Sequence, residues 1–150
     1  MRTRTAALSL SAAALVGIAV IEGYKSDAYI PVPGDVPTIG FGNTEGVEMG
    51  DKTTPERALV QLLKDSNKFQ KAIKTCVKVP LYQYEYDAYI QLSYNIGPAA
   101  FCKSSIVKEL NAGNYESACK HILDWNKFNG KPLPGLTKRR QEEYRTCTGT

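Results

Sequence analysis

The sequence contains only one histidine, His121, and no CxxC pair of cysteines. HExxH metalloproteases and most histidine-rich zinc sites need at least two histidines, while zinc fingers and thioredoxin-like proteins use CxxC pairs. A Ser-His-Asp hydrolase would depend entirely on that one residue. We therefore expect no metal site and no cofactor, and any catalysis must come from carboxylates, hydroxyls or cysteines.

The sequence also lacks internal repeats, low-complexity linkers and a large excess of charge. Its 150 residues are 43% hydrophobic and 23% charged, which is typical of one globular domain. The net charge of +4 favours an anionic partner such as nucleic acid, a membrane surface or a cell-wall polymer. The basic carboxy-terminal stretch is interrupted by Glu142 and Glu143 and accompanies no nucleic-acid motif, so nucleic acid is not the expected partner.

The cysteines are four in number, an even count that predicts two disulfides and an oxidising compartment. Four unpaired buried thiols in a cytosolic protein are the alternative. Three connectivities are possible. We favour Cys102–Cys119 with Cys76–Cys147, because Cys102 and Cys119 are the two cysteines nearest to each other in the sequence.

The amino terminus has the pattern of an export signal. Arg2 and Arg4 precede 16 uncharged residues, Ala6 to Ile21. This apolar run is just under the roughly 17 residues needed to span a bilayer. It is rich in alanine, serine and glycine, so its affinity for a membrane is expected to be marginal.

Three fates of this segment are open. A signal peptidase could cut after Ala14 or Ala19, or the segment could be an ordinary core helix. We favour an uncleaved signal anchor over residues 1–21, with its arginines on the cytoplasmic side. The reason is that Glu22, the best candidate for a catalytic residue, follows the apolar run without a spacer, and cleavage after Ala19 would leave it near a new terminus.

The remaining chain, residues 22–150, has an α+β pattern. Prolines and glycines between Gly23 and Gly50 predict turns and a small antiparallel sheet. Helices are predicted over residues 55–75, from beyond Pro80 to Gly97, from Ser104 or Ser105 to Ala112, over 115–125 and over 135–146, with a loop over 127–134. The aromatic residues assigned to the core rather than to sugar stacking are Tyr82, Tyr84, Tyr86, Tyr89 and Trp125. We expect a small β lobe and a larger helical lobe with a cleft between them.

Two carboxylates are enough to hydrolyse a glycosidic bond, one as general acid and one to activate water or attack the sugar. Glu22 lies between an apolar helix and the β segment, which favours the protonated form that a general acid needs. Asp35 lies in a solvated loop rich in proline and glycine, where it should be ionised. Asp27 is the competing carboxylate, which we interpret as a solvated turn residue.

Several of these residues carry a resemblance to the phage-type lysozymes of glycoside hydrolase family 24. Glu22-Gly23, Tyr29, Gly34 and Thr38-Ile-Gly-Phe-Gly42 resemble the catalytic region of that family. Later landmarks that are similar to its helical lobe are Tyr94 to Gly97, Ala112-Gly113, Trp125 and Gly135 to Glu143. The family aspartate usually comes two residues after the tyrosine, where this chain has Pro31, so its role is carried over to Asp35 in a loop one residue longer.

The resemblance implies a lysozyme-like fold and an endolysin that hydrolyses the β-1,4 bond between N-acetylmuramic acid and N-acetylglucosamine in bacterial peptidoglycan, lysing the host at the end of a phage cycle. Glu22 would protonate the glycosidic oxygen, while Asp35 and Thr38 would orient the attacking water. Inversion, which is usual in the family, predicts carboxyl groups about 6.5–9.5 Å apart. A transglycosylase using Glu22 alone, an inactive wall-binding protein and a holin-like membrane protein are the alternatives.

The amino-terminal segment resembles that of signal-anchor-release endolysins. The resemblance implies export by the host, tethering to the inner membrane through residues 6–21 on its periplasmic side, and later release of a soluble monomer into the periplasm. Residues 6–21 would then pack on the protein as part of a helix ending at Glu22. No cysteine occurs in residues 1–21, so we expect no thiol isomerisation during release.

Overall fold

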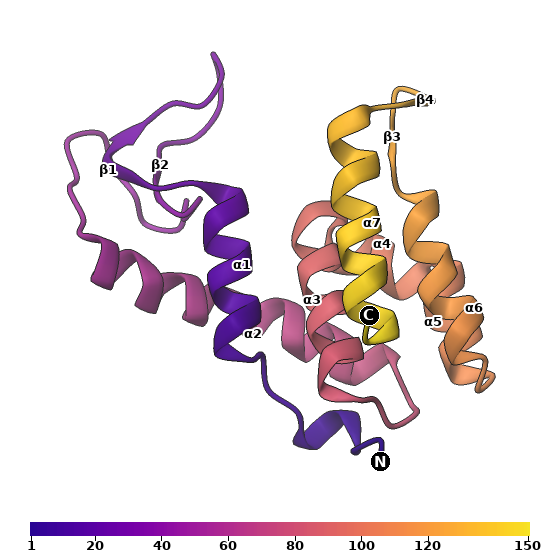
Figure 1. The fold of residues 1–150 in the computed structure, drawn as a ribbon. Helices are drawn as coiled ribbons and strands as arrows, with labels where there is room; N and C mark the ends of the chain where they lie inside the picture. Colours follow the sequence, from indigo (N-terminus) through magenta and orange to yellow (C-terminus); the bar gives the residue numbers. More distant parts are fainter. The chain divides into compact units, whose positions relative to one another are not determined.

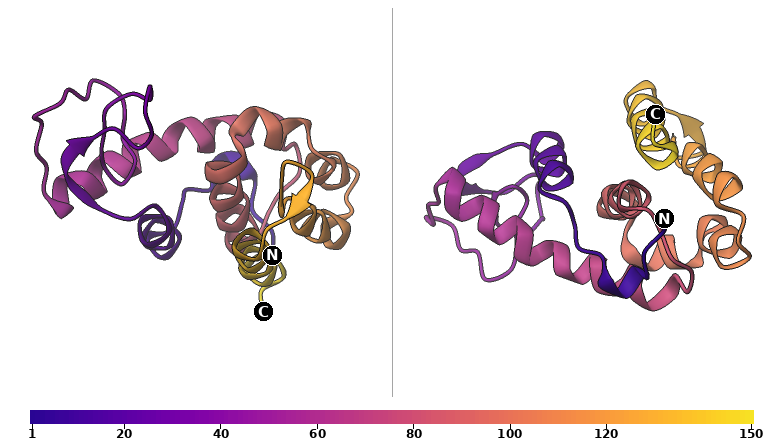
Figure 2. Two further views of the ribbon diagram at one scale, coloured as in Figure 1. Left: turned by 90° about the horizontal axis from the view of Figure 1, so that it is seen from above. Right: turned by 60° about the horizontal axis from the view of Figure 1, so that its bottom comes forward.

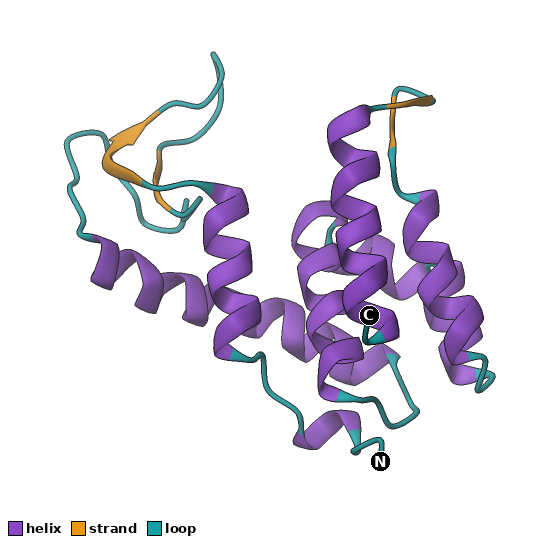
Figure 3. Cartoon of the chain, viewed as in Figure 1, coloured by secondary structure: helices purple, strands orange, loops and turns teal.

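The computed structural model describes residues 1–150, which form two compact units. The helical unit comprises Met1–Ala14 and Lys68–Thr150, and the β unit comprises Leu15–Asn67. Helices dominate, and the strands are few and short (Figures 1 and 3). The predicted α+β content is confirmed.

The β unit is built around a two-stranded antiparallel sheet. Strand β1 (Lys25–Tyr29) pairs with β2 (Thr38–Gly40), and the register places Lys25 opposite Gly40 and Tyr29 opposite Thr38. Helix α1 (Ala12–Glu22) leads directly into β1 (Figure 1). The small sheet predicted between Gly23 and Gly50 is therefore present.

Helix α2 (Pro55–Cys76) begins and ends close to its predicted bounds. The Thr54 hydroxyl accepts a hydrogen bond of 3.3 Å from the Arg57 backbone N–H, as expected of an N-cap, and proline occupies the first helical position. Ala58 packs so tightly on β2 that a Cβ built at Gly40 would lie 2.9 Å from the Ala58 Cβ. Gly40 also has φ +64°, so both the space and the backbone require glycine there.

The core of the helical unit is centred on helix α3 (Gln83–Ile96), which packs against α7 (Pro134–Thr148). Tyr86 and Tyr89 are completely buried, as predicted for core residues, whereas Tyr84 is 38% exposed. Helix α3 ends at Gly97, and Pro98 follows, as the sequence indicated. Helix α6 (Tyr115–Lys120) and the 3-10 helix η2 (His121–Asp124) pack against α7, and Figure 2 shows them next to it.

Three elements differ from the predictions. Helix α4 (Pro98–Lys103) was not expected, because Gly97-Pro98 indicated only the end of the preceding helix. Proline is also favourable at the first position of a helix, and here Pro98 begins α4. The helix predicted over 115–125 is α6 followed by η2, while α5 (Ser105–Asn111) has nearly its predicted bounds. The predicted loop contains a hairpin of β3 (Lys127–Phe128) and β4 (Lys131–Pro132). Its turn is Asn129-Gly130, with φ values of 50° and 77°.

Two disulfides are present, but the favoured pairing is wrong. Cys76 pairs with Cys102, with Cα atoms 5.7 Å apart, and Cys119 pairs with Cys147, at 5.8 Å. Sequence distance was misleading because α5 separates the two nearest cysteines, whereas α6 packs directly on α7 and brings Cys119 to Cys147. The Cys102 sulfur also lies 3.5 Å from the Ala72 carbonyl on α2.

The apolar amino-terminal segment is not one continuous helix. A 3-10 turn, η1 (Thr5–Ala7), and an extended stretch with buried Leu8 and Leu10 precede α1. Helix α1 ends at Glu22 but begins at Ala12, where the Ser11 hydroxyl accepts a 3.1 Å hydrogen bond from the Ala14 N–H. None of the helices combines the length and the apolar character that crossing a membrane requires.

Candidate active site

Glu22 is the last residue of α1. The chain turns sharply after it, since Gly23 has φ +72° and donates its backbone N–H to the Ala19 carbonyl at 3.0 Å. The Glu22 side chain is exposed and is directed to the turn after β2, because a Cβ built at Gly42 would lie 3.7 Å from Glu22 Oε2. The Thr-Ile-Gly-Phe-Gly segment is therefore a neighbour of this carboxylate.

Asp35 lies in the exposed turn that precedes β2. Its backbone N–H donates to the Val32 carbonyl at 3.0 Å, and Gly34 provides the positive φ of +86° that the turn needs. The Asp35 carboxylate oxygen Oδ1 accepts a 2.9 Å hydrogen bond from the Val36 N–H. This leaves Oδ2 without a protein partner, so it can reach a water or a substrate hydroxyl.

Thr38 is buried, with only 6% of its surface exposed, and it begins β2 opposite Tyr29. Its hydroxyl donates to the Val36 carbonyl at 3.2 Å. Since that bond uses the hydroxyl proton, the oxygen lone pairs remain to accept a hydrogen bond. Asp35 and Thr38 are therefore both hydrogen-bonded to the backbone of Val36. These two residues and Glu22, the three predicted site residues, all lie in the β unit.

Asp27 has partners that suit a structural residue. It lies on β1 rather than in a turn, and its carboxylate accepts hydrogen bonds from Lys52 Nζ at 2.8 Å and from the Ser26 hydroxyl at 2.7 Å. The hydrogen bond from Lys52 lowers the pKa of Asp27, as do the Ser26 hydroxyl and the Lys52 charge. A general acid needs the opposite change in pKa.

A cavity of about 370 Å³ in the β unit does not contain the predicted residues. It lies between the loop after β2 and the start of α2, with Phe41, Asn43, Asp51, Lys52, Arg57 and Gln61 in its walls. No cluster of histidine, cysteine, aspartate and glutamate side chains is arranged to hold a metal ion. The three predicted site residues supply two carboxylates and a hydroxyl.

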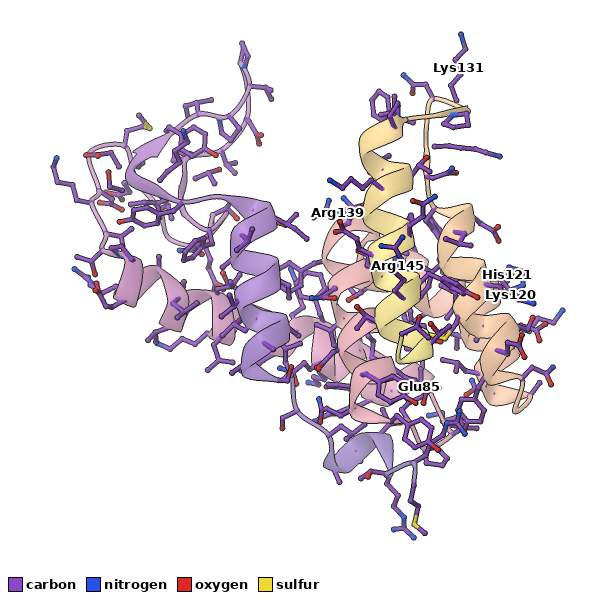
Figure 4. The ribbon with its side chains drawn as sticks, in the orientation of Figure 1. Glu85, Lys120, His121, Lys131, Arg139 and Arg145 are labelled. Carbon is purple, nitrogen blue, oxygen red and sulfur yellow. A yellow bond between two sulfur atoms is a disulfide. The ribbon has the colours of Figure 1, made fainter.

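In the helical unit, two of the landmarks noted in the sequence meet around the buried Arg140. Arg140 on α7 is fully buried; its Nε lies 2.8 Å from Glu143 Oε2, and its Nη1 donates to Asn95 Oδ1 on α3 at 2.9 Å. Burial raises the pKa of Glu143 to about 7, although Arg140 acts in the opposite direction. These residues join α3 to α7. The neighbouring Arg139 and the exposed Arg145 are labelled in Figure 4.

The comparisons with known proteins agree on one family. The phage lysozyme family model matches residues 19–143. An SAR-endolysin of Pseudomonas phage phiKMV is 39% identical over 140 residues, which cover 91% of this chain and 86% of that protein. A variant of P22 lysozyme has a TM-score of 0.85 at 33% identity, covering 94% of this chain and 99% of that one. The active form of the P1 phage endolysin Lyz has a TM-score of 0.81 at 28% identity, covering 96% and 88%.

The chain therefore belongs to the phage lysozyme family and has a lysozyme-like α+β fold. Within that class it is an endolysin muramidase, a glycoside hydrolase that acts on peptidoglycan. The family, fold and activity indicated by the sequence are confirmed. Nothing in the fold or in these relatives favours a transglycosylase or an inactive wall-binding protein.

Proposed function

We propose that Glu22 is the general acid of the muramidase and that Asp35 and Thr38 position the water that attacks the anomeric carbon. The observation that carries this assignment is the placement of Glu22 against Gly42, in the turn that directly follows the strand begun by Thr38. The assignment of Asp35 is supported by its position in the turn before that same strand and by its unengaged Oδ2.

The local chemistry suits these roles. Glu22, the last residue of α1, would act in its protonated form. It would give that proton to the glycosidic oxygen as the bond to the muramic acid carbon breaks. Asp35 would accept a proton from water, and the Thr38 oxygen would accept a hydrogen bond from the same water. The product then has the inverted configuration at its anomeric carbon.

The test compares purified wild type with Glu22→Gln and Asp35→Asn in clearing permeabilised Gram-negative cells. Both variants should lose about 100-fold or more of the activity, a loss in the range assigned to general acid or base catalysis. Asp27→Asn is the matched control and should stay near wild type. Mass analysis of the released muropeptides should show no anhydro sugars. Anhydro products, together with an active Asp35→Asn variant, would instead assign the single-carboxylate reaction.

We propose further that residues 1–21 are an uncleaved signal anchor. In this view the exported protein is first tethered to the inner membrane, facing the periplasm, and is later released there as a soluble monomer. Support comes from the uncharged apolar run, from the exposed valines of α1 and from the SAR-endolysin relatives. Mass spectrometry of the exported protein should find the intact amino terminus, and cell fractionation should find it first in the membrane. A mature protein starting at residue 15 or 20 would contradict this.

A further inference from the structure

The first eleven residues, which we call the strap, are fastened to the helical unit by specific polar contacts. Thr3 and Leu81 exchange two backbone hydrogen bonds of 2.8 Å, and the Thr5 hydroxyl donates to the Val79 carbonyl at 2.7 Å. Both partners lie in the segment that leads into α3. Figure 2 shows the amino terminus beside the start of that helix.

Arg2 makes the most elaborate of these contacts. Its Nε and Nη2 donate to the two carboxylate oxygens of Glu85 at 3.0 and 3.2 Å. Its guanidinium carbon lies 4.4 Å from the centre of the Tyr82 ring and 3.6 Å from the centre of the Tyr115 ring. A planar, bidentate cation between aromatic rings is an arrangement that arginine can make and lysine cannot reproduce.

Glu85 depends on this partner, because its side chain is only 3% exposed. Its Oε1 also accepts a 2.7 Å hydrogen bond from the Tyr82 N–H, which caps the start of α3. Removing a cation from a buried ion pair leaves an uncompensated charge, which is strongly unfavourable. The order of this end of α3 is therefore coupled to the presence of Arg2.

The far end of the strap is held by two more buried groups. Ser11 donates its backbone N–H and its hydroxyl to the two oxygens of Asp87, at 3.0 and 2.6 Å. The Leu10 N–H donates to Gln70 Oε1 at 2.9 Å. The strap is thus bound at both ends. Its far end joins polar groups that also bind α3, because Gln70 Oε1 accepts a hydrogen bond from the Tyr86 hydroxyl and Asp87 Oδ1 accepts one from Gln83.

We propose that Tyr82, Glu85 and Tyr115 form a capture site for the Arg2 side chain, which retains the strap on the protein after release and opposes its return to the membrane. This inference rests on the proposed signal anchor. In the tethered form Arg2 lies on the cytoplasmic side, so the site on the periplasmic body is empty. Once the segment leaves the bilayer Arg2 fills the site, and only the released form gains its binding energy.

The chain contains its own control in Arg4, which carries the same charge two residues later. Arg4 is exposed and makes no side-chain hydrogen bond or ion pair. Arg2→Ala and Arg4→Ala therefore remove equal charge from the export signal, and only Arg2→Ala empties the capture site. Any effect of charge on export or orientation should appear in both variants.

The experiment expresses the full chain, collapses the membrane potential and follows the ratio of membrane-bound to soluble periplasmic protein. Arg2→Ala should raise that ratio about tenfold relative to Arg4→Ala, which corresponds to the loss of one strong charged contact. Glu85→Gln should also raise it, and the double variant should be no worse than the more affected single variant, because each change destroys the same contact. Arg2→Lys should recover only part of the effect.

Purified proteins give a second measurement that does not depend on the membrane. Arg2→Ala should lower the melting temperature by roughly 3–6 °C, and Arg4→Ala should leave it unchanged. Equal partitioning and equal melting of the two arginine variants would overturn the capture site while leaving the anchor in place. A wild-type protein that never enters the membrane would contradict the anchor itself, and with it the role of the site in release.

Discussion

Asp35 and Thr38 are hydrogen-bonded to opposite backbone groups of the same residue, Val36. The Asp35 carboxylate accepts the Val36 N–H at 2.9 Å, and the Thr38 hydroxyl donates to the Val36 carbonyl at 3.2 Å. The two side chains therefore fix the peptide segment that lies between them and fix one another through it. The proposed role of both residues in positioning water needs such a support, because small displacements of catalytic groups reduce rates strongly.

The hydroxyl of Thr38 can be removed almost without changing the shape of the side chain. Thr38→Val should reduce cell-wall hydrolysis about 10-fold to 100-fold, while the loss of one hydrogen bond should lower the free energy of unfolding by only about 1 kcal/mol. Thr38→Ser should restore most of the activity. Initial clearing rates and chemical denaturation of the three proteins provide the test. A Thr38→Val variant with wild-type activity would remove this residue from the site.

The two disulfides close loops of similar length, with sequence separations of 26 and 28. Chain entropy alone predicts that removing either one costs about the same, roughly 3 kcal/mol. Cys119 and Cys147 are buried against the Tyr89 hydroxyl, however, whereas Cys76 and Cys102 are half-buried. The double serine variant at 119 and 147 should therefore melt lower than that at 76 and 102, because it also buries two new hydroxyl groups. Equal melting would indicate that chain entropy dominates.

Glu143 should make stability depend on pH in an unusual direction. Burial raises its pKa to about 7 in the folded protein, from 4.5, so the folded state holds a proton that the unfolded state has lost. Stability therefore falls as pH rises from about 4.5 to about 7, by an amount of the order of 2–3 kcal/mol for this group alone. Denaturation of wild type and Glu143→Gln across that range measures the effect. The variant should show the flatter profile, and identical profiles would contradict the assignment.

Gly40 and Gly46 offer a matched pair of substitutions. Their φ values are +64° and +69°, so alanine suffers similar backbone strain at both. Only at Gly40 would the new Cβ meet an obstacle, the Ala58 Cβ at 2.9 Å; at Gly46 nothing lies within 4 Å. We expect Gly46→Ala to cost about 1 kcal/mol of unfolding free energy and Gly40→Ala at least twice that. Similar costs would mean that α2 can move away from β2 easily.

Local signals in the sequence predicted much of the fold. Thr54-Pro55 marks the start of α2 and Gly97-Pro98 marks the end of α3. Each signal consists of two adjacent residues, and both helix boundaries were predicted correctly. The Asn129-Gly130 turn is an equally local hairpin signal, and it lies in the segment that was expected to be a loop. Short elements such as α4 were missed because six residues show too little periodicity to be distinguished from a loop.

Contacts between distant residues could not be obtained in this way. Arg2 and Glu85 are separated by 83 positions, and nothing in the sequence near either residue indicates the other. The predicted cysteine pairing was wrong for the same reason, because the actual pairing depends on how α6 packs against α7. For the site, the residue types and their order indicated Glu22, Asp35 and Thr38, but the shared attachment to Val36 required coordinates.

Helix α1 has almost no polar side until Glu22, and it leaves Val16 and Val20 53% and 76% exposed to water. An ordinary surface helix would carry glutamine or lysine at these two positions, and the protein would then be more soluble. Under the proposed signal anchor, the same helix also has to be compatible with lipid, and that requirement would account for the valines at these positions. Val16→Gln combined with Val20→Gln should therefore yield a more soluble protein and, under the proposed anchor, a smaller membrane-bound fraction of the exported protein.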